Sequence, residues 1–163
     1  MCSHGQFGRR LLCLTTACLL LVSVVGPAQA RLRHTIGTML KVTQVRPADK
    51  TDGDADKNIS KDVRRALRRK FGLKYDAYRL EAQQAREASI NQEQVFPLVN
   101  GSELRLRVVG YKPSTRLVDL KVQTEDDIKA LTVRSGGHLI LTFDGEQDPL
   151  FVVITVRLLQ IER

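Results

Sequence analysis

The second half of the chain alternates apolar and polar residues, and this pattern constrains the fold more than any other feature. Between residues 95 and 159, the alternation is interrupted by short segments rich in Gly, Pro, Asn or Asp. Apolar residues at every second position place one face of a strand in a core. The alternating apolar residues are Leu104, Leu106, Val108, Val118, Leu120, Val122, Leu139, Leu141 and Phe143. This spacing predicts a meander of about six antiparallel strands.

Three further signals specify how these strands are arranged. Asn100-Gly101 and Gly136-Gly137 are both predicted to form tight hairpin turns, because their residues tolerate positive φ. Pro97 lacks a backbone N–H, so the strand at residues 95–99 should lie at a sheet edge. Residues 150–159 are almost continuously apolar, which predicts a strand that is central or buried on both faces.

An amphipathic helix is predicted at residues 59–71, after a first strand at 36–45 and a polar loop at 49–57. Pro47 should end that first strand. Asn58 or Ser60 can cap the start of the helix, and Gly72 should end it. At 100° per residue, five apolar side chains share one arc: Ile59, Val63, Ala66, Leu67 and Phe71. Four arginines lie on the opposite arc: Arg64, Arg65, Arg68 and Arg69.

Residues 75–94 carry two conflicting signals. Their composition, rich in Glu, Gln and Ala, favours a helix, whereas Tyr78, Leu80 and Ala82 alternate as in a strand. From the residues alone, both alternatives stay open. The expected fold class is α+β: a mostly antiparallel sheet or partial sandwich, with one amphipathic helix packed on it.

The first thirty residues have the pattern of a secretory signal peptide. Arg9 and Arg10 precede an apolar run at residues 11–25, and Ala28-Gln29-Ala30 provides small residues at a cleavage site. The run is shorter than the roughly 20 residues of a membrane-spanning helix. We therefore expect cleavage after Ala30 and export to the periplasm or the cell exterior. The rival interpretation is a lipid anchor on Cys18, but Thr15 replaces the aliphatic residue expected three positions earlier.

Cleavage of the expected leader would remove every cysteine from the exported protein. All three cysteines, Cys2, Cys13 and Cys18, fall inside the expected leader. Residues 31–163 should then form a single β-rich domain without a disulfide, a cysteine nucleophile or a thiolate metal site. The full chain has 42% hydrophobic and 27% charged residues, which is ordinary for a globular protein.

Residues 67–80 resemble a helix end followed by FGY-x-x-Y-x-L, an element of a group of small exported bacterial proteins with no assigned activity. The group also has a P-L-x-N-G hairpin, matched by residues 97–101. Its T-V-x-x-x-G-G-x-L-x-L hairpin resembles residues 132–141, which have one residue fewer between Val133 and Gly136. The resemblance spans residues 67–156 and rests on turn and packing positions, so it implies a scaffold and not an activity.

This resemblance implies that residues 78–88 are extended. The chain departs from the group at Thr142-Phe143, where a second glycine pair usually follows the hairpin. The glycine hairpin with its flanking strands is also similar to a segment of the outer-membrane secretins.

The acidic loop is the best candidate for a metal site. Asp52, Asp54 and Asp56 have the D-x-D-x-D spacing of a calcium loop, and calcium prefers such oxygen ligands. However, Lys57 stands where the sharp turn needs glycine, and Val63 stands where a carboxylate should close the site. We therefore expect a solvated acidic loop, and neither a metal nor any other cofactor.

The arginine arc is the candidate anion site, because guanidinium groups bind phosphate and carboxylate in bidentate fashion. Its members Arg64, Arg65, Arg68 and Arg69 could bind anionic lipid, glycan or another phosphate-bearing surface. Alternatively, they form a solvated face that pairs with nearby acids such as Asp54 and Asp56. A nucleic-acid partner is not expected, because the chain should be exported and carries no recognition motif.

Catalytic groups are sparse, so we expect no enzyme. The histidines after the leader, His34 and His138, lie far apart in the sequence, and Asp126 and Asp127 are adjacent in a turn. Neither pair meets the spacing that acid–base chemistry needs. The leading hypothesis is an exported protein of the bacterial envelope that acts by contact with an envelope protein or with itself. The alternative is a binder of anionic surfaces through the basic helix face.

Overall fold

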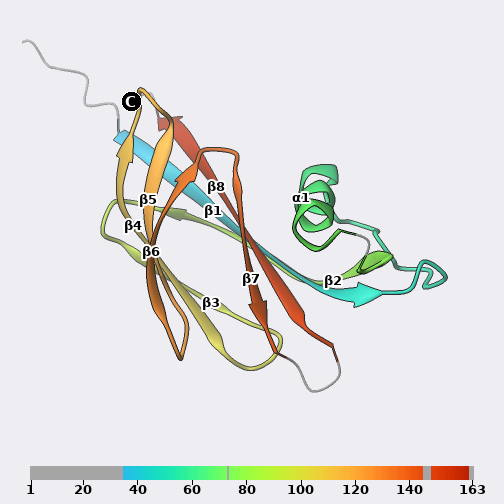
Figure 1. Ribbon diagram of the computed structural model, residues 1–163. Coiled ribbons are helices and arrows are strands. Elements are labelled where there is room, and N and C mark those ends of the chain that lie inside the picture. Colours follow the sequence, from blue (N-terminus) through green and yellow to red (C-terminus); the bar gives the residue numbers. More distant parts are fainter. Residues whose placement is uncertain (1–34, 73, 145–147, 162–163) are drawn as a thin grey trace, which may run out of the picture. The chain divides into compact units, whose positions relative to one another are not determined.

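A computed structural model describes residues 35–72, 74–144 and 148–161 (Figure 1). The predicted leader, its cleavage site after Ala30, and His34 lie outside these residues. In chain order the elements are β1 (Thr35–Ala48), α1 (Lys61–Phe71), β2 (Ala77–Ala88), β3 (Glu93–Pro97), β4 (Glu103–Lys112), β5 (Leu117–Gln123), β6 (Ile128–Arg134), β7 (His138–Phe143) and β8 (Leu150–Ile161). Within the described part, no helix is long and apolar enough to span a membrane.

The strands form two antiparallel sheets of four strands each. Sheet A has the order β2-β1-β8-β7, and sheet B has the order β3-β4-β5-β6. An antiparallel sheet structure with a short helix confirms the predicted α+β class. The extended conformation implied for residues 78–88 is also confirmed, because β2 covers them and pairs with β1.

The prediction of one continuous meander of six strands is wrong. Strands β3 to β6 do follow one another in sheet B, but β7 and β8 belong to sheet A with β1 and β2. The chain changes sheets at the turn between β6 and β7. Alternation identified the strands correctly, but it carries no information on which strand pairs with which.

Gly136-Gly137 forms this turn and is therefore not a hairpin. The Gly137 N–H donates to the Arg134 carbonyl (2.7 Å), and Gly136 has a φ of +85°. A positive φ at the third turn residue alone is the pattern of a type II turn, whose twist splays the flanking strands apart. A Cβ on Gly137 would meet the Arg134 carbonyl oxygen at 2.8 Å, so this position requires glycine.

The Asn100-Gly101 turn does join the paired strands β3 and β4, but it is longer than predicted. The Leu98 N–H donates to the Ser102 carbonyl (2.9 Å), and the Gly101 N–H donates to the Leu98 carbonyl (3.0 Å). Of its residues, only Gly101 has a positive φ, +89°. The loop therefore has three residues and a glycine in the left-handed region, which is the next most common hairpin after the two-residue type.

Pro47 does not end the first strand, as the sequence predicted, since β1 continues to Ala48. The pairing of β1 with β8 ends at Val45, whereas its pairing with β2 continues through Pro47 and Ala48. Over these last residues β1 is itself an edge strand, where a missing N–H is tolerated.

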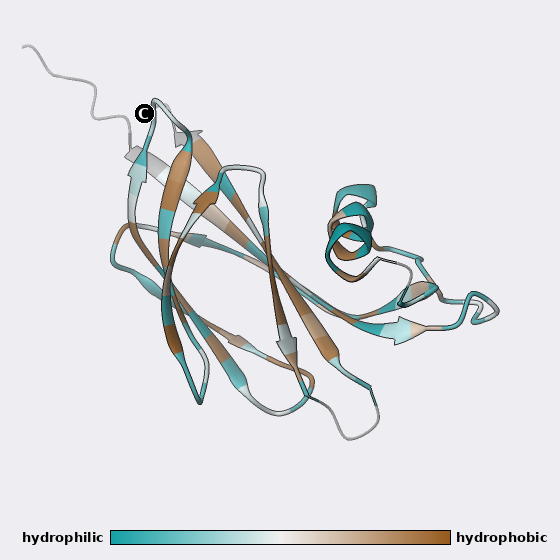
Figure 2. Ribbon diagram, viewed as in Figure 1, coloured by the Kyte–Doolittle hydropathy of each residue, from teal (hydrophilic) through white to brown (hydrophobic). Residues whose placement is uncertain are grey.

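Sheet A is buried on both faces along β8. Leu150, Val152 and Ile154 belong to a core cluster that also contains side chains of sheet B, such as Leu106 and Leu120. Phe151 and Val153 point the other way, into a second cluster with α1. Burial on both faces is confirmed for residues 150–154 and explains why this part of β8 lacks alternation (Figure 2). The predicted central position is also confirmed, because β8 lies between β1 and β7.

Helix α1 packs on the outer side of sheet A. Ser60 caps it by accepting from the Val63 N–H (3.3 Å), and Gly72 ends it with a positive φ. Val63 and Leu67 are buried against the sheet, whereas most of the helix surface is hydrophilic (Figure 2). The predicted amphipathic helix is therefore confirmed, starting two residues later than expected.

Candidate functional site

Strand β7 is the edge strand that is least protected against pairing with a strand of another molecule. Natural proteins shield edge strands with charged side chains or proline. Strand β2 has four charged residues, β3 has Pro97 and Glu93, and β6 has Lys129 and Arg134. The sequence of β7, HLILTF, contains neither aspartate, glutamate, lysine, arginine nor proline. Among the described strands it has one neighbour, β8.

One backbone acceptor of β7 is occupied by a side chain from α1. Lys70 Nζ donates to the Ile140 carbonyl oxygen at 2.6 Å, and its ammonium lies 5.5 Å from the Phe71 ring centroid. The Val156 carbonyl of β8 accepts from the Gly136 N–H (2.7 Å), so the even-numbered residues of β8 direct their backbone groups toward β7. In the observed register these residues oppose Leu139 and Leu141, which leaves the backbone groups of Ile140 on the other side of the strand. The Ile140 carbonyl therefore faces away from β8 and is available to an added strand once Lys70 moves.

A hollow of about 750 Å³ lies between α1 and the first half of β7. The cations that line this hollow all belong to α1, and one carboxylate, Asp62, lies among them. The basic residues are Arg65, Arg69 and Lys70. His138 begins the strand here, and its Nδ1 lies 2.8 Å from Thr155 Oγ1. Burial lowers the pKa of His138, and the Asp62 charge opposes this only in part. The positive charge at this end of β7 therefore comes from the three basic residues of α1 and not from His138.

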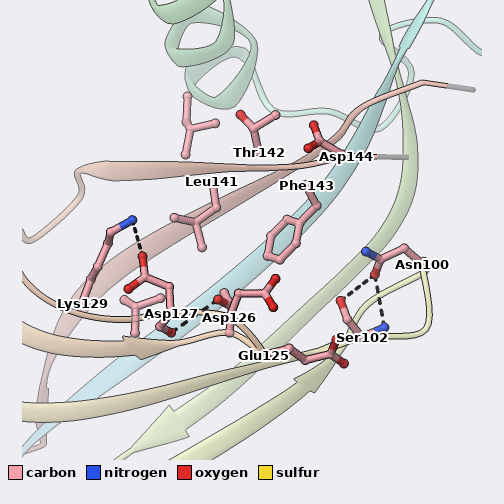
Figure 3. A pocket seen from close by; sticks show the side chains of 13 residues that line it. Asn100, Ser102, Glu125, Asp126, Asp127, Lys129, Leu141, Thr142, Phe143 and Asp144 are labelled. Atoms are coloured by element: carbon pink, nitrogen blue, oxygen red, sulfur yellow. Dashed lines mark hydrogen bonds and ion pairs between the residues drawn. The ribbon is translucent and has the colours of Figure 1, made fainter. Parts of the chain in front are cut away.

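A second hollow, of about 570 Å³, lies against the other half of β7 (Figure 3). Leu141 and Phe143 point into it, whereas Thr142 points to the opposite side of the sheet. Its rim comes from the β5–β6 loop, the β3–β4 loop and the end of β7. The carboxylates that line it are Glu125, Asp126, Asp127 and Asp144, with one cation, Lys129.

The charges of this second hollow are only partly compensated. Asp127 pairs with Lys129, and the hydrogen bond from that ammonium lowers the pKa of Asp127. In the described part of the chain, Glu125, Asp126 and Asp144 make no ion pair. Asp126 and Asp127, the adjacent acids of the predicted turn, are exposed and line this hollow. The phenylalanine end of β7 is therefore negative and the histidine end positive.

The predicted calcium ligands are engaged by other groups. Asp52 Oδ1 accepts from the Asp54 N–H (3.1 Å), and Asp54 pairs with Lys57 at 3.3 Å. Asp56 Oδ1 accepts from the Tyr78 N–H (3.3 Å), and its other oxygen faces two arginines. Over residues 35–72, 74–144 and 148–161, no three His, Cys, Asp or Glu side chains are grouped to hold a metal ion.

The four predicted arginines do not form one equivalent set. Asp56 Oδ2 lies 3.6 Å from Arg64 and 3.9 Å from Arg68, and Arg64 is half-buried. Arg65 pairs with Asp62 on the exposed helix surface at 3.5 Å. Within the described part, Arg69 makes no ion pair. Lys61 lines the same shallow depression of about 480 Å³ as the four arginines, although it was not among the predicted residues.

The edge of β7 was not predicted from the sequence. A six-residue strand without a charge or proline is a weak signal, which becomes informative only once its place in the sheet is known. The acidic residues Glu125 and Asp144 were missed as well, because nothing local connects the β5–β6 loop with the end of β7. Comparisons with protein-family models, curated proteins and solved structures found no match to this chain.

Proposed function

We propose that this chain is a non-enzymatic protein exported to the bacterial envelope, periplasmic or extracellular, that acts by protein–protein contact. The contact is formed by main-chain pairing of an extended segment with the edge of β7. One observation carries this proposal: β7 is an edge strand without an Asp, Glu, Lys, Arg or Pro of its own, and it lies between two hollows of opposite charge. The leader pattern of residues 1–30 supports export.

Strand addition suits this edge because backbone hydrogen bonds supply affinity while flanking side chains supply selectivity. The Ile140 carbonyl already binds a donor that does not belong to a strand, Lys70. An added strand would offer amide donors to this carbonyl and to other outward-facing groups of β7. The two hollows would receive the side chains of the added segment on either side of the sheet.

The same proposal includes a sandwich arrangement of sheets A and B. Its support is the core cluster that joins Leu40, Val152 and Ile154 of sheet A with Leu104 and Leu120 of sheet B. A rigid two-layer scaffold would hold the edge of β7 in a fixed extended shape, which lowers the entropy cost of pairing.

The edge contact can be tested by photo-crosslinking in growing bacterial cells that express the full chain. A photoreactive amino acid replaces Thr142, which is exposed on β7, and in a control it replaces Gln83, which is exposed on β2. We expect a discrete covalent adduct from position 142, at least about tenfold stronger than any adduct from position 83. Equal adducts from both positions, or none from position 142, would contradict the proposal.

A second candidate function is binding of an anionic surface, such as phospholipid or acidic glycan, by the basic face of α1. The observation that favours it is the row of exposed cations Lys61, Arg65 and Arg69, which lies on the side of α1 away from the core. In the described part of the chain, the nearby carboxylate of Asp56 pairs with Arg64 and Arg68, and that of Asp62 pairs with Arg65. Among the described residues, these carboxylates form no ion pair with the other cations of the helix face.

Charge reversal distinguishes this second function. Arg65→Glu with Arg69→Glu should weaken sedimentation with vesicles of equal parts phosphatidylcholine and phosphatidylglycerol by at least about 25-fold. Each cation near such a surface contributes about 1 kcal/mol. The matched control is Lys112→Glu with Arg134→Glu, which changes the net charge equally at exposed positions of β4 and β6. Equal sedimentation of both variants would show that the helix face is not the binding surface.

A further inference from the structure

We infer that the strand that pairs with β7 is β7 of a second copy of this chain, antiparallel and related by a two-fold axis. The inference rests on the proposed function of the β7 edge and names its partner. A two-fold contact uses the same surface on both copies, so this surface must be complementary to itself. Strand β7 meets that requirement in its backbone and in its charges.

The backbone of β7 is suited to antiparallel self-pairing. In an antiparallel ladder, both backbone groups of one residue face the same neighbour, and those of the next residue face the opposite side. The Ile140 carbonyl faces outward to Lys70, so the outward-facing residues are His138, Ile140 and Thr142. These residues can exchange hydrogen bonds with the same residues of a second β7 if the two-fold axis passes at Ile140 or Leu141. The Ile140 carbonyl would then accept from a backbone N–H in place of Lys70.

The charges along β7 select the antiparallel direction. The hollow at the histidine end holds three cations and one carboxylate, whereas the hollow at the phenylalanine end holds four carboxylates and one cation. Antiparallel pairing brings the positive end of one copy to the same level along the strand as the negative end of the other, although the two hollows lie on opposite faces of the sheet. Parallel pairing would bring like charges to the same level, which is unfavourable.

The exposed side chains of β7 add to this self-complementarity. Leu141 and Phe143 point to one side of the sheet and Thr142 to the other (Figure 3). Across a two-fold pair, each side chain meets one from the second copy on the same face of the sheet. The partly exposed apolar residues Leu139 and Leu141 would thus be covered by their counterparts, and no charge would be buried in the ladder.

A cysteine scan tests this arrangement in the full chain, purified in the form that cells accumulate. Cys2, Cys13 and Cys18 are replaced by serine, so that each variant has one thiol. A single cysteine is then placed at His138, Ile140, Leu141 or Thr142, with Gln83→Cys on β2 as the control. A residue opposite its own copy has a Cα–Cα distance of about 4.5–5.5 Å, which a disulfide can bridge.

We expect efficient disulfide-linked dimers at Ile140 or Leu141 and at least about tenfold less at His138. His138 would be offset from its own counterpart by four to six residues, which is at least about 14 Å at a rise of about 3.4 Å per residue. Sedimentation of the serine-substituted protein should show a mass of two copies. Thr142→Pro, which removes an outward-facing N–H from an edge strand, should give a folded monomer, whereas Thr142→Ala should remain a dimer.

Three results would overturn the inference. The first is a protein that sediments as a monomer at about 100 μM. The second is an equal yield of disulfide-linked dimer from all cysteine positions, including Gln83→Cys. The third is a yield of disulfide-linked dimer that is highest for His138→Cys. The photo-crosslinking experiment separates this failure from failure of the proposed function. An adduct from position 142 with twice the mass of the chain supports both, whereas an adduct with a different protein supports the edge contact and excludes the second copy.

Discussion

Replacing Phe151 with alanine should lower the free energy of unfolding by about 3–5 kcal/mol, the range typical of a buried phenylalanine. Phe151 is 1% exposed and lies at the centre of an aromatic cluster on the outer side of sheet A. Its ring centroid is 4.3 Å from that of Phe71, 5.3 Å from Tyr75 and 6.1 Å from Tyr78. Truncation would leave a cavity among three elements and remove these ring contacts together.

The measurement is urea unfolding followed by circular dichroism, because the chain has no tryptophan. Phe143→Ala is the matched control, since Phe143 is half-buried and lies outside the aromatic cluster. It should cost about 1–2 kcal/mol, the ordinary range for a single substitution. Hydrogen exchange should also show that Phe151→Ala exposes the amides of α1 more than those of β5. Equal costs for the two variants would contradict this role of Phe151.

The features that the sequence predicted well are those determined by local periodicity. The buried faces of α1 and β5 follow from side chains spaced by one helical turn or by two residues. The cap at Ser60 and the stop at Gly72 depend on a few adjacent residues. Strand β8 was recognised because burial on both faces removes the polar half of the alternation.

The features that the sequence could not predict depend on which distant segments meet. Gly136-Gly137 looks like a hairpin in the sequence, but its type II geometry directs β7 to sheet A and away from β6. Likewise, Pro47 is tolerated in β1 only because β8 begins too late to pair with it. For Pro47 the deciding strand lies about a hundred residues away in the sequence. For Gly136-Gly137 the deciding strand is β8, which follows β7 in the chain and belongs to sheet A.

The candidate site shows the same division between local and distant information. The arginine pattern predicted a basic face on α1, and the helix does expose Arg65 and Arg69. The pairing of Asp56 with Arg64 and Arg68 was expected only in general terms, because it depends on how the loop folds back onto the helix. The edge of β7 exists only through the order of strands in sheet A, so no window of the sequence could reveal it.

Gln44 is a buried polar residue that connects sheet A to the end of β3, and its loss should also be costly. Gln44 is fully buried on β1. Its Nε2 donates to the Pro97 carbonyl at 3.0 Å, and its Oε1 accepts from the Val99 N–H at 2.8 Å. Both groups belong to the β3–β4 hairpin of sheet B. One amide therefore satisfies a donor and an acceptor that secondary structure leaves unpaired.

Gln44→Met keeps the approximate shape of the side chain and removes both hydrogen bonds. We expect a loss of about 1–3 kcal/mol in the free energy of unfolding, because the Val99 N–H is left without this acceptor. The Pro97 carbonyl retains one donor, since Gln84 Nε2 also reaches it at 3.2 Å. Gln84→Met is therefore the matched control, and its cost should stay below about 0.5 kcal/mol because this hydrogen bond is solvent-exposed.

The double variant provides the decisive comparison, because it leaves the Pro97 carbonyl with neither donor. Groups that share a partner do not act additively, so the double variant should cost at least about 0.5 kcal/mol more than the sum of the single variants. Urea unfolding of the four proteins measures this coupling directly. If the effects simply add, or if Gln44→Met is as mild as Gln84→Met, the buried amide does not hold the β3–β4 hairpin against sheet A.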